Sequence, residues 1–357
     1  MPSPDNSIAA YDYDLPPEQI AQAPLPERAS SRLLVLDRSS GATRHHVFSD
    51  LPALLTPGDL LILNRSRVLP ARLLGRRSGG GGAEILLVRR RGRDLWHALL
   101  RPGRRLRPGS EVIIAPGFTA RVEDHPGPEA EEPAGPLRPV RLVSDHTDPD
   151  TAIERHGHVP QPPYIRRPDE PADRDRYQTV YARESGSVAA PTAGLHLTPD
   201  LLERLHRRGI DTAELVLHVG PGTFRPVEAE DVRQHRVDPE LFTIPGATAE
   251  AVNAARADGR RIVAVGTTST RALESALGPE SSLRAGDGET SLVIVPGHRF
   301  EVVDALVTNF HLPRSSLLLL VSALAGRENV LALNHHGVEI GETNGAYNVV
   351  IGNCIGI

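Results

Sequence analysis

Hydrophobic residues follow two different patterns along the 357-residue chain. Outside residues 68–150, short apolar runs such as 60–64 (LLILN) and 261–265 (RIVAV) alternate with capped helical stretches such as 199–209. Apolar strands without polar alternation are typical of a sheet that is covered on both faces. Their alternation with helices predicts an α/β fold, with a mostly parallel sheet and helices on both faces. The expected strands are 32–37, 60–64, 214–219, 261–265 and 291–295, and the expected helices are 16–22, 51–55, 199–209, 248–259, 270–277 and 315–326.

The stretch 68–150 has a β-type pattern instead. Segments of five to eight residues are separated by turns, and no helical period appears. Regular short strands of this kind predict a small β-barrel or sandwich. Because helix–strand alternation resumes afterwards, we predict a β-barrel domain at 68–150 inserted into an α/β domain made of 1–67 and 151–333. Residues 334–357 then form a C-terminal tail.

Composition narrows the classes of protein. No apolar run approaches the roughly 18 residues of a membrane helix, and the N-terminus lacks the basic and apolar parts of a signal peptide. The single cysteine, Cys354, excludes an intramolecular disulfide framework and a thiolate metal cluster. We therefore expect a cytoplasmic protein with no membrane contact and no metal. The chain has no lysine, so a phosphate-loop lysine and a Schiff-base lysine are excluded, and its net charge of −5 leaves only a local basic face for nucleic acid.

The stretch 184–197 (ESGSVAAPTAGLHL) is the most unusual in the chain. Small residues dominate it, and glycines such as Gly194 let the backbone approach a ligand closely. Thr192 and His196 are the side chains that could reach into such a space. A tightly packed crossover loop is the alternative interpretation.

Three further segments follow expected strands, at the carboxyl ends where open α/β sheets bind ligands. They are 220–227 (GPGTFRPV), 266–271 (GTTSTR) and 309–316 (NFHLPRSS). GTTSTR offers hydroxyls and backbone N–H groups at a helix start, which suit an anion or a ribose; an ordinary N-cap explains it equally. GPGTF alone is a common turn, and no dinucleotide-binding glycine pattern occurs.

Ionisable residues gather at the same ends. His196, His218 and His311 each lie at or near one of them, and Glu274 follows GTTSTR on the same helix. A single histidine is usually structural, but three at one edge indicate function. Their spacing does not match a metal site. For Glu274 the alternative is a solvated helix face.

Arginines crowd the expected barrel, including Arg89, Arg90, Arg104 and Arg105. The guanidinium fork suits phosphate oxygens. A charged face that protects a sheet edge from aggregation is the alternative.

Several blocks together resemble one known family. YQTVYARESGSVAAPTAGLHLT, HVGPGTFRPV, GTTSTRALES and TNFHLPRSSLLLLVSALAG look like S-adenosylmethionine:tRNA ribosyltransferase-isomerase, and the N-terminal YDYDLPPEQIAQ and LLILNRSRVLPARL fit the same family in order. The resemblance implies an α/β domain with an inserted barrel. It also implies transfer of the ribosyl part of S-adenosylmethionine to 7-aminomethyl-7-deazaguanine at the tRNA wobble position, giving epoxyqueuosine, adenine and methionine. S-adenosylmethionine is then a consumed substrate, and no cofactor is expected.

This chemistry suggests a role for each candidate. A base must take a proton next to the sulfonium and an acid must assist adenine departure, so His196 and His218 are the proton-transfer candidates. Glu274 would orient a histidine or bind ribose hydroxyls, and Arg183 and Arg225 would join the barrel arginines in meeting tRNA phosphates. The expected substrate-binding residues are Thr192, Gly194, Gly220, Gly222, Thr223, Gly266, Thr267, Thr268, Arg271, Asn309 and His311, of which Thr267, Thr268 and Arg271 would grip the ribose or the methionine carboxylate.

The tail departs from the family. From Asn334 the chain reads NHHGVEIGETNGAYNVVIGNCIGI, where the family has an aromatic-rich closing segment. A catalytically impaired tRNA-binding homologue is therefore the alternative function, and a transferase acting on free nucleosides is a third. We expect a monomer rather than an obligate oligomer.

Overall fold

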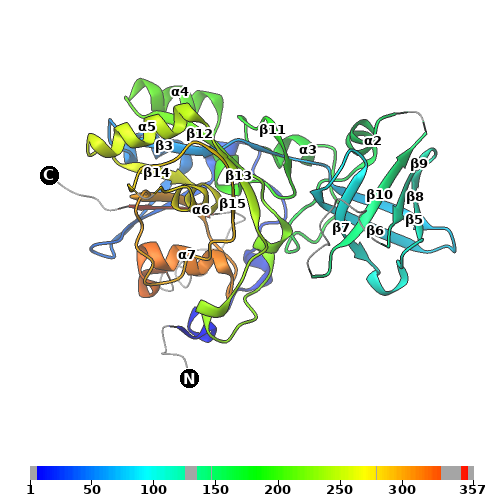
Figure 1. Cartoon of the computed structure of the whole chain (residues 1–357). Coiled ribbons are helices and arrows are strands. Elements are labelled where there is room, and N and C mark those ends of the chain that lie inside the picture. Colours follow the sequence, from blue (N-terminus) through cyan, green and yellow to red (C-terminus); the bar gives the residue numbers. More distant parts are fainter. Residues whose placement is uncertain (1–5, 125–134, 146, 279, 331–346, 353–357) are drawn as a thin grey trace.

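The computed structural model describes residues 6–124, 135–145, 147–278, 280–330 and 347–352. They form a nine-stranded sheet and a closed barrel, at the left and right of Figure 1. This confirms the predicted α/β class with a barrel. The order across the sheet is β15 (Gly286–Thr290), β13 (Glu240–Ile244), β12 (Asp211–Leu217), β3 (Leu60–Asn64), β14 (Ile262–Val265), β16 (Ala305–Asn309), β17 (Tyr347–Gly352), β1 (Arg32–Asp37) and β2 (Thr43–Val47).

The centre of the sheet is parallel and its flanks are not. β12, β3, β14 and β16 run parallel to one another, whereas β13 and β15 on one side and β2 on the other pair antiparallel with their neighbours. The sheet is therefore mixed: β12, β3, β14 and β16 form a continuous parallel centre, and β17 and β1 form a separate parallel pair.

Helices cover both faces of the sheet, as predicted. Leu61 and Leu63 of β3 pack with α1 (Leu51–Leu54) and α4 (Pro199–Arg207). Leu60 and Ile62, which alternate with them, pack in the cluster that contains α5 (Gly246–Ala257), α6 (Thr267–Ser275) and α7 (Ser316–Ala325). This period-two alternation of apolar side chains fixes the strand between the two helical layers.

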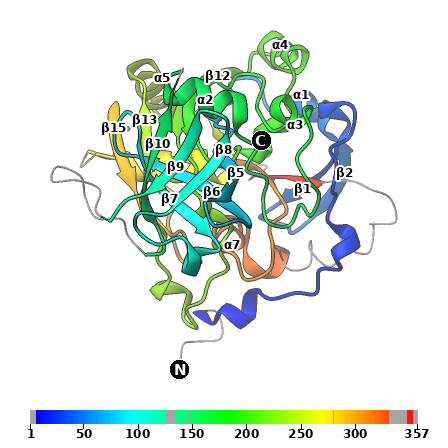
Figure 2. The ribbon, with the colours of Figure 1, turned by 90° about the vertical axis from the view of Figure 1, so that its right-hand side faces the viewer.

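The barrel has the strand order β10-β7-β6-β5-β8-β9 and closes on itself. Its strands are β5 (Arg72–Arg77), β6 (Gly82–Arg90), β7 (Leu95–Arg101), β8 (Glu111–Ala115), β9 (Phe118–Val122) and β10 (Arg138–Ser144). The helix α2 (Pro149–His156) adds Ala152 and Ile153 to the barrel core. α3 (Asp173–Arg176) and the short pair β4 (Ser66–Val68) and β11 (Glu184–Ser187) lie toward the α/β domain, and Figure 2 shows the barrel standing in front of the sheet.

Some predicted elements were wrong. Residues 291–295 (SLVIV) form no strand; the strand is the preceding polar stretch, β15. Gly288 lies opposite Phe242 of β13, and it must be glycine there because a Cβ would come within 2.4 Å of the phenyl ring. The helix expected at 16–22 is only a 3₁₀ turn, Pro17–Gln19.

Part of the tail belongs to the sheet. β17 pairs in parallel with β1 and antiparallel with β16, so it fills the space between them. Residues 331–346 and 353–357, which include Cys354, lie outside the described residues. Among the described helices, none has the length and apolar character that a membrane crossing requires.

Candidate functional site

A cavity of about 390 Å³ lies where β14 and β16 end. It is lined by the 3₁₀ helix Thr192–His196, the start of α6 and the residues after β16. Gly266 makes the turn from β14 into α6 with a φ of +90°, a value that favours glycine. Seven of the predicted site residues meet here, namely Thr192, His196, Gly266, Thr267, Thr268, Asn309 and His311.

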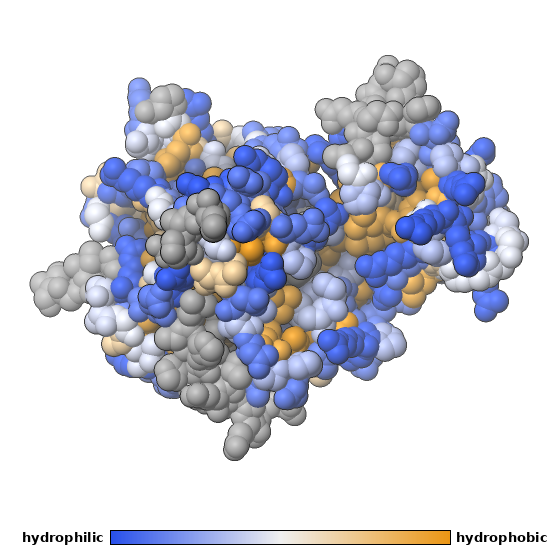
Figure 3. Space-filling view, turned by 90° about the horizontal axis from the view of Figure 1, so that it is seen from below, coloured by the Kyte–Doolittle hydropathy of each residue, from blue (hydrophilic) through white to orange (hydrophobic). Residues whose placement is uncertain are grey.

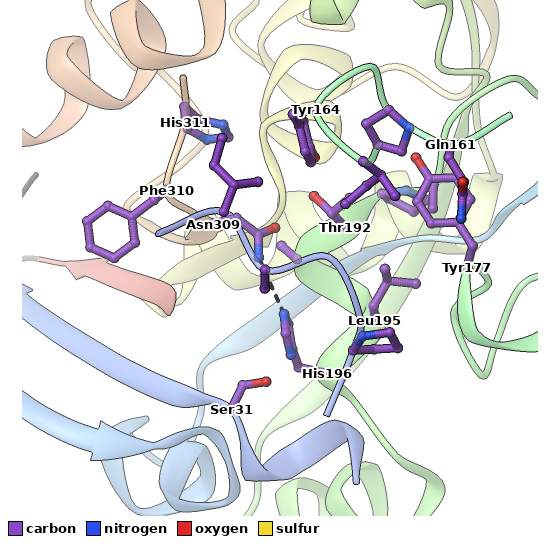
Figure 4. A pocket seen from close by; sticks show the side chains of 18 of the residues that line it. Ser31, Gln161, Tyr164, Tyr177, Thr192, Leu195, His196, Asn309, Phe310 and His311 are labelled. Atoms are coloured by element: carbon purple, nitrogen blue, oxygen red, sulfur yellow. Dashed lines mark hydrogen bonds between the residues drawn. The ribbon is translucent and has the colours of Figure 1, made fainter. Parts of the chain in front are cut away.

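Hydrogen bonds fix the protonation of His196. Its Nδ1 lies 3.3 Å from the carbonyl oxygen of Arg28, and its Nε2 lies 3.3 Å from Nδ2 of Asn309, the dashed line in Figure 4. A carbonyl only accepts, so Nδ1 carries the proton and Nε2 is the acceptor. Burial lowers the pKa of His196 to about 4. His196 is therefore a neutral imidazole at pH 7.

His311 is neutral for the same reason. Burial lowers its pKa to about 4, and its Nε2 lies 2.9 Å from Oγ1 of Thr308. Its carbonyl accepts a 2.5 Å hydrogen bond from the hydroxyl of Tyr13. These contacts tie the N-terminal segment to the residues after β16 and complete one wall of the cavity.

Aromatic rings form much of the remaining wall. Tyr13, Tyr164, Tyr177 and Phe310 line it, and Gln161, another lining residue, is drawn next to Tyr177 in Figure 4. Burial raises the pKa of Tyr164 to about 12, so its hydroxyl stays neutral. Such a wall suits a flat ring or a cation, since aromatic faces attract both. Sequence reasoning missed these residues.

Six further predicted residues line a second cavity, of about 560 Å³, between the barrel and the α/β domain. His218, Gly220, Gly222 and Arg271 come from the α/β domain, and Arg89 and Arg90 come from the barrel. Val219 and Leu317 line both cavities, so the two spaces share a wall. The structure thus divides the single edge expected from the sequence into two adjacent sites.

A buried ion pair marks the second cavity. Nη1 of Arg271 bonds to Oε2 of Glu240, and Nε donates to the carbonyl of Leu292 at 2.9 Å. The other carboxylate oxygen accepts from the N–H of Gly220 at 2.8 Å. Sequence reasoning missed Glu240, because a glutamate at the start of a strand carries no signal of its own.

The imidazole of His218 packs against the backbone of Gly186. A Cβ on Gly186, whose φ is +151°, would lie 2.6 Å from the imidazole ring. Burial lowers the pKa of His218, while Glu184 opposes that shift. His218 is therefore held close to the wall of the second cavity rather than beside His196.

Two candidates serve the fold instead of either cavity. The carboxylate of Glu274 accepts from the backbone N–H groups of Glu301, Val302 and Val303, each at 3.0 Å. Gly194 leaves room for a tyrosine, because its Cβ would lie 2.1 Å from the hydroxyl of Tyr181. Thr223 lies in the 3₁₀ helix Pro221–Phe224, and its side chain is not described.

The arginines proposed for tRNA differ in their surroundings. Arg89 forms a 3.0 Å ion pair with Glu289 across the two domains, and Arg90 pairs with Asp150 and lies over Trp96. The remaining four are surface residues. Arg183 pairs with Glu214, Arg225 pairs with Asp238 at 3.6 Å, and Arg104 and Arg105 are exposed on the barrel. Within the described part of the chain, no group of three or more His, Cys, Asp or Glu residues could hold a metal ion.

Two adjacent cavities suit an enzyme that transfers a group between two substrates. Comparison with known proteins identifies the family. The profile of the queuosine biosynthesis protein family matches residues 8–341, and the chain belongs to that family. Curated relatives named S-adenosylmethionine:tRNA ribosyltransferase-isomerase include one from Thermus thermophilus, 52% identical over 91% of this chain and 92% of its own length. Another, from Syntrophomonas wolfei, is 50% identical over 93% of both chains.

A solved structure is similar over nearly the whole chain. It is the crystal structure of S-adenosylmethionine tRNA ribosyltransferase from Thermotoga maritima, with 34% sequence identity and a TM-score of 0.53. The aligned region includes 96% of this chain and 99% of the Thermotoga maritima chain. The resemblance identified from the sequence motifs is thereby confirmed.

Proposed function

We propose that this chain is an S-adenosylmethionine:tRNA ribosyltransferase-isomerase. It transfers and isomerises the ribosyl group of S-adenosylmethionine onto 7-aminomethyl-7-deazaguanine at the tRNA wobble position, forming epoxyqueuosine and releasing adenine and methionine. The observation that carries this proposal is the identity of about half to relatives of that name over more than nine-tenths of both chains. None of the comparisons favours the catalytically impaired alternative.

We assign S-adenosylmethionine to the first cavity. Its sulfonium is a cation, and the aromatic wall of Tyr13, Tyr164 and Tyr177 would attract it. The start of α6 would offer N–H groups to the methionine carboxylate, and the hydroxyls of Thr267 and Thr268 would reach the ribose. S-adenosylmethionine is consumed, so the reaction needs no further cofactor.

His196 is our candidate for the base. His196 lines the cavity, its Nε2 accepts only from the amide of Asn309 among the described residues, and its low pKa keeps Nε2 unprotonated at neutral pH. A proton on the carbon next to the sulfonium would move to Nε2, and Nδ1–H, held by the carbonyl of Arg28, would keep the ring oriented. His218, on the far side of the shared wall, is then the candidate acid for a later step.

The tRNA would approach over the barrel. Arg89 and Arg90 border the second cavity, and Arg104 and Arg105 are exposed on the same domain. Arginine pairs well with phosphate oxygens, and such contacts position a nucleic acid without reading its sequence. One chain supplies both cavities, so we propose that the enzyme acts as a monomer, in the cytoplasm where its tRNA substrate is found.

The direct test incubates the protein with S-adenosylmethionine and with tRNA that carries the deazaguanine precursor. The adenine released is measured by chromatography. We expect adenine only with that tRNA. For His196→Gln we expect a rate lower by about 10²- to 10⁴-fold, the usual contribution of a general base. His206→Gln, on the exposed side of α4, is the matched control and should keep full activity.

Two results would count against the proposal. Absence of adenine with tRNA still bound would indicate a binding homologue that has lost catalysis. If His196→Gln keeps full activity, the proposed reaction stands but His196 is not its base.

A further inference from the structure

Three residues that line the second cavity have buried side-chain nitrogens without hydrogen-bond partners among the described residues. Nη2 of Arg271, Nε1 of Trp96 and Nδ1 of His218 are buried, and none has a hydrogen-bond partner among the described residues. Trp96 is 4% exposed and Arg271 is 6% exposed. Buried polar groups in native proteins are nearly always paired, so several unpaired ones in one cavity need an explanation. A ligand that brings acceptors to them would supply it.

The chemistry of these groups limits that ligand. Guanidinium and indole nitrogens only donate, so the ligand must present acceptors to Arg271 and Trp96. Arg271 is already neutralised by the carboxylate of Glu240. A second full negative charge placed beside that carboxylate would be repelled, because like charges interact strongly where water is excluded. The pattern therefore favours a neutral ring with an acceptor edge over a carboxylate or a phosphate.

The position of the cavity points to a nucleobase. One side comes from barrel residues around Arg89 to Arg91, and the other from His218 to Gly222. Figure 3 shows a recess between the two parts of the molecule, with apolar residues on the barrel side. A base rotated out of an RNA loop could enter such a recess while barrel arginines contact its phosphates.

We propose that the second cavity binds the wobble base itself, with the carbonyl oxygen of its guanine-type ring accepting a hydrogen bond from Nη2 of Arg271. This inference rests on the proposed function and assigns its second substrate to a site. Arginine is the side chain that most often reads the guanine carbonyl. Val219 and Leu317 separate the two cavities, so a base here would lie next to S-adenosylmethionine in the first one. Arg271 is then a specificity residue for the base rather than a grip on the methionine carboxylate.

Trp96 makes the proposal measurable, because it is the only tryptophan in the chain. We would follow its fluorescence while adding, separately, free 7-aminomethyl-7-deazaguanine and S-adenosylmethionine. A saturable change with the base and none with S-adenosylmethionine is expected. A change with S-adenosylmethionine alone would overturn the proposal and assign the methionine part to this cavity.

The matching variant removes the ion pair as a unit. Arg271→Gln combined with Glu240→Gln keeps the pair neutral and so avoids leaving one buried charge unpaired. Binding of an anticodon stem-loop RNA is measured with the deazaguanine base, or with adenine, at the wobble position. We expect the variant to lose about tenfold or more of its preference for the first RNA. Its calorimetric affinity for S-adenosylmethionine should be unchanged.

Arg104→Gln is the control. Arg104 is exposed on the barrel, so its replacement should weaken both RNAs alike, as removal of a phosphate partner does. Unchanged preference in the double variant, or a reduced affinity for S-adenosylmethionine, would refute the assignment. These results can be told apart from failure of the proposed function, because that failure abolishes adenine release in the unaltered protein.

Discussion

Replacement of Glu274 would show whether its carboxylate supports the fold or the reaction. The side chain is 2% exposed, and three backbone N–H groups donate to it at 3.0 Å. Two of these donors, at Val302 and Val303, share Oε1 and are partly buried, while the donor at Glu301 is exposed. The carboxylate therefore joins the C-terminal end of α6 to the chain that leads into β16.

The magnitude follows from these donors. A buried donor left without a partner costs about 1–3 kcal/mol. Glu274→Ala strands the N–H groups of Val302 and Val303, while water can reach that of Glu301, so we expect a loss of about 2–6 kcal/mol in the free energy of unfolding. Glu274→Gln keeps one oxygen for Val302 and Val303 and turns its amide toward Glu301. We expect it to lose only about 1 kcal/mol.

The assay pairs urea unfolding with adenine release measured at a temperature where each variant is folded. The expected result is an order of stability with the unaltered protein first, Glu274→Gln second and Glu274→Ala last, and with turnover of the folded Gln variant nearly normal. Normal stability of Glu274→Gln together with a hundredfold loss of turnover would refute this reasoning and return Glu274 to catalysis.

Three further predictions concern the cavities and the barrel. The pKa of His196 in the folded protein is about 4, below the ordinary value of 6.5. Between these two pH values the unfolded chain protonates His196 and the folded protein does not. The free energy of unfolding should therefore fall as the pH drops from 6.5 to 4. At about 1.36 kcal/mol per pKa unit, and with water in the cavity reducing the cost, the loss is about 1–3 kcal/mol, and His196→Gln should flatten this part of the unfolding–pH curve. Gly194→Ala should cost more than about 1 kcal/mol in thermal unfolding, because the new methyl group would meet the hydroxyl of Tyr181; an unchanged midpoint would contradict it. Arg104→Gln with Arg105→Gln should reduce the dependence of tRNA affinity on salt, by a slope of nearly one for each phosphate that an arginine no longer neutralises, and an unchanged slope would exclude these residues from the interface.

Much of the fold could be predicted from hydrophobic pattern alone. β14 is apolar throughout, β3 is apolar up to its last residue, and both lie in the centre of the sheet. Thr198 caps α4 by accepting from the N–H of Leu201. The formation of a strand at β15 rather than at 291–295 could not be predicted, because β15 is polar and pairs with β13, which is far away in sequence.

The site was predicted in part. Strand-end reasoning found the loops with Thr192, His196 and Asn309, because parallel strands place their ends at one edge. The wall that separates His218 and Arg271 from these residues was not predicted. It contains Val219 and Leu317, and apolar residues in the sequence do not show that they will divide a site. Strand-end reasoning also gave Glu274 a chemical role, because its three backbone partners exist only after folding.

The pairing of β1 has a consequence for how the chain is made. Its partners among the described strands are β2 and β17, which begins only at Tyr347. Leu33, Leu34 and Leu36 are fully buried in the finished sheet, although they are synthesised long before the strand that joins them to β16. The backbone hydrogen bonds on this side of β1 can therefore form only after the chain as far as β17 has left the ribosome. Domains usually fold in the order of their synthesis; here the first strand must wait for the last.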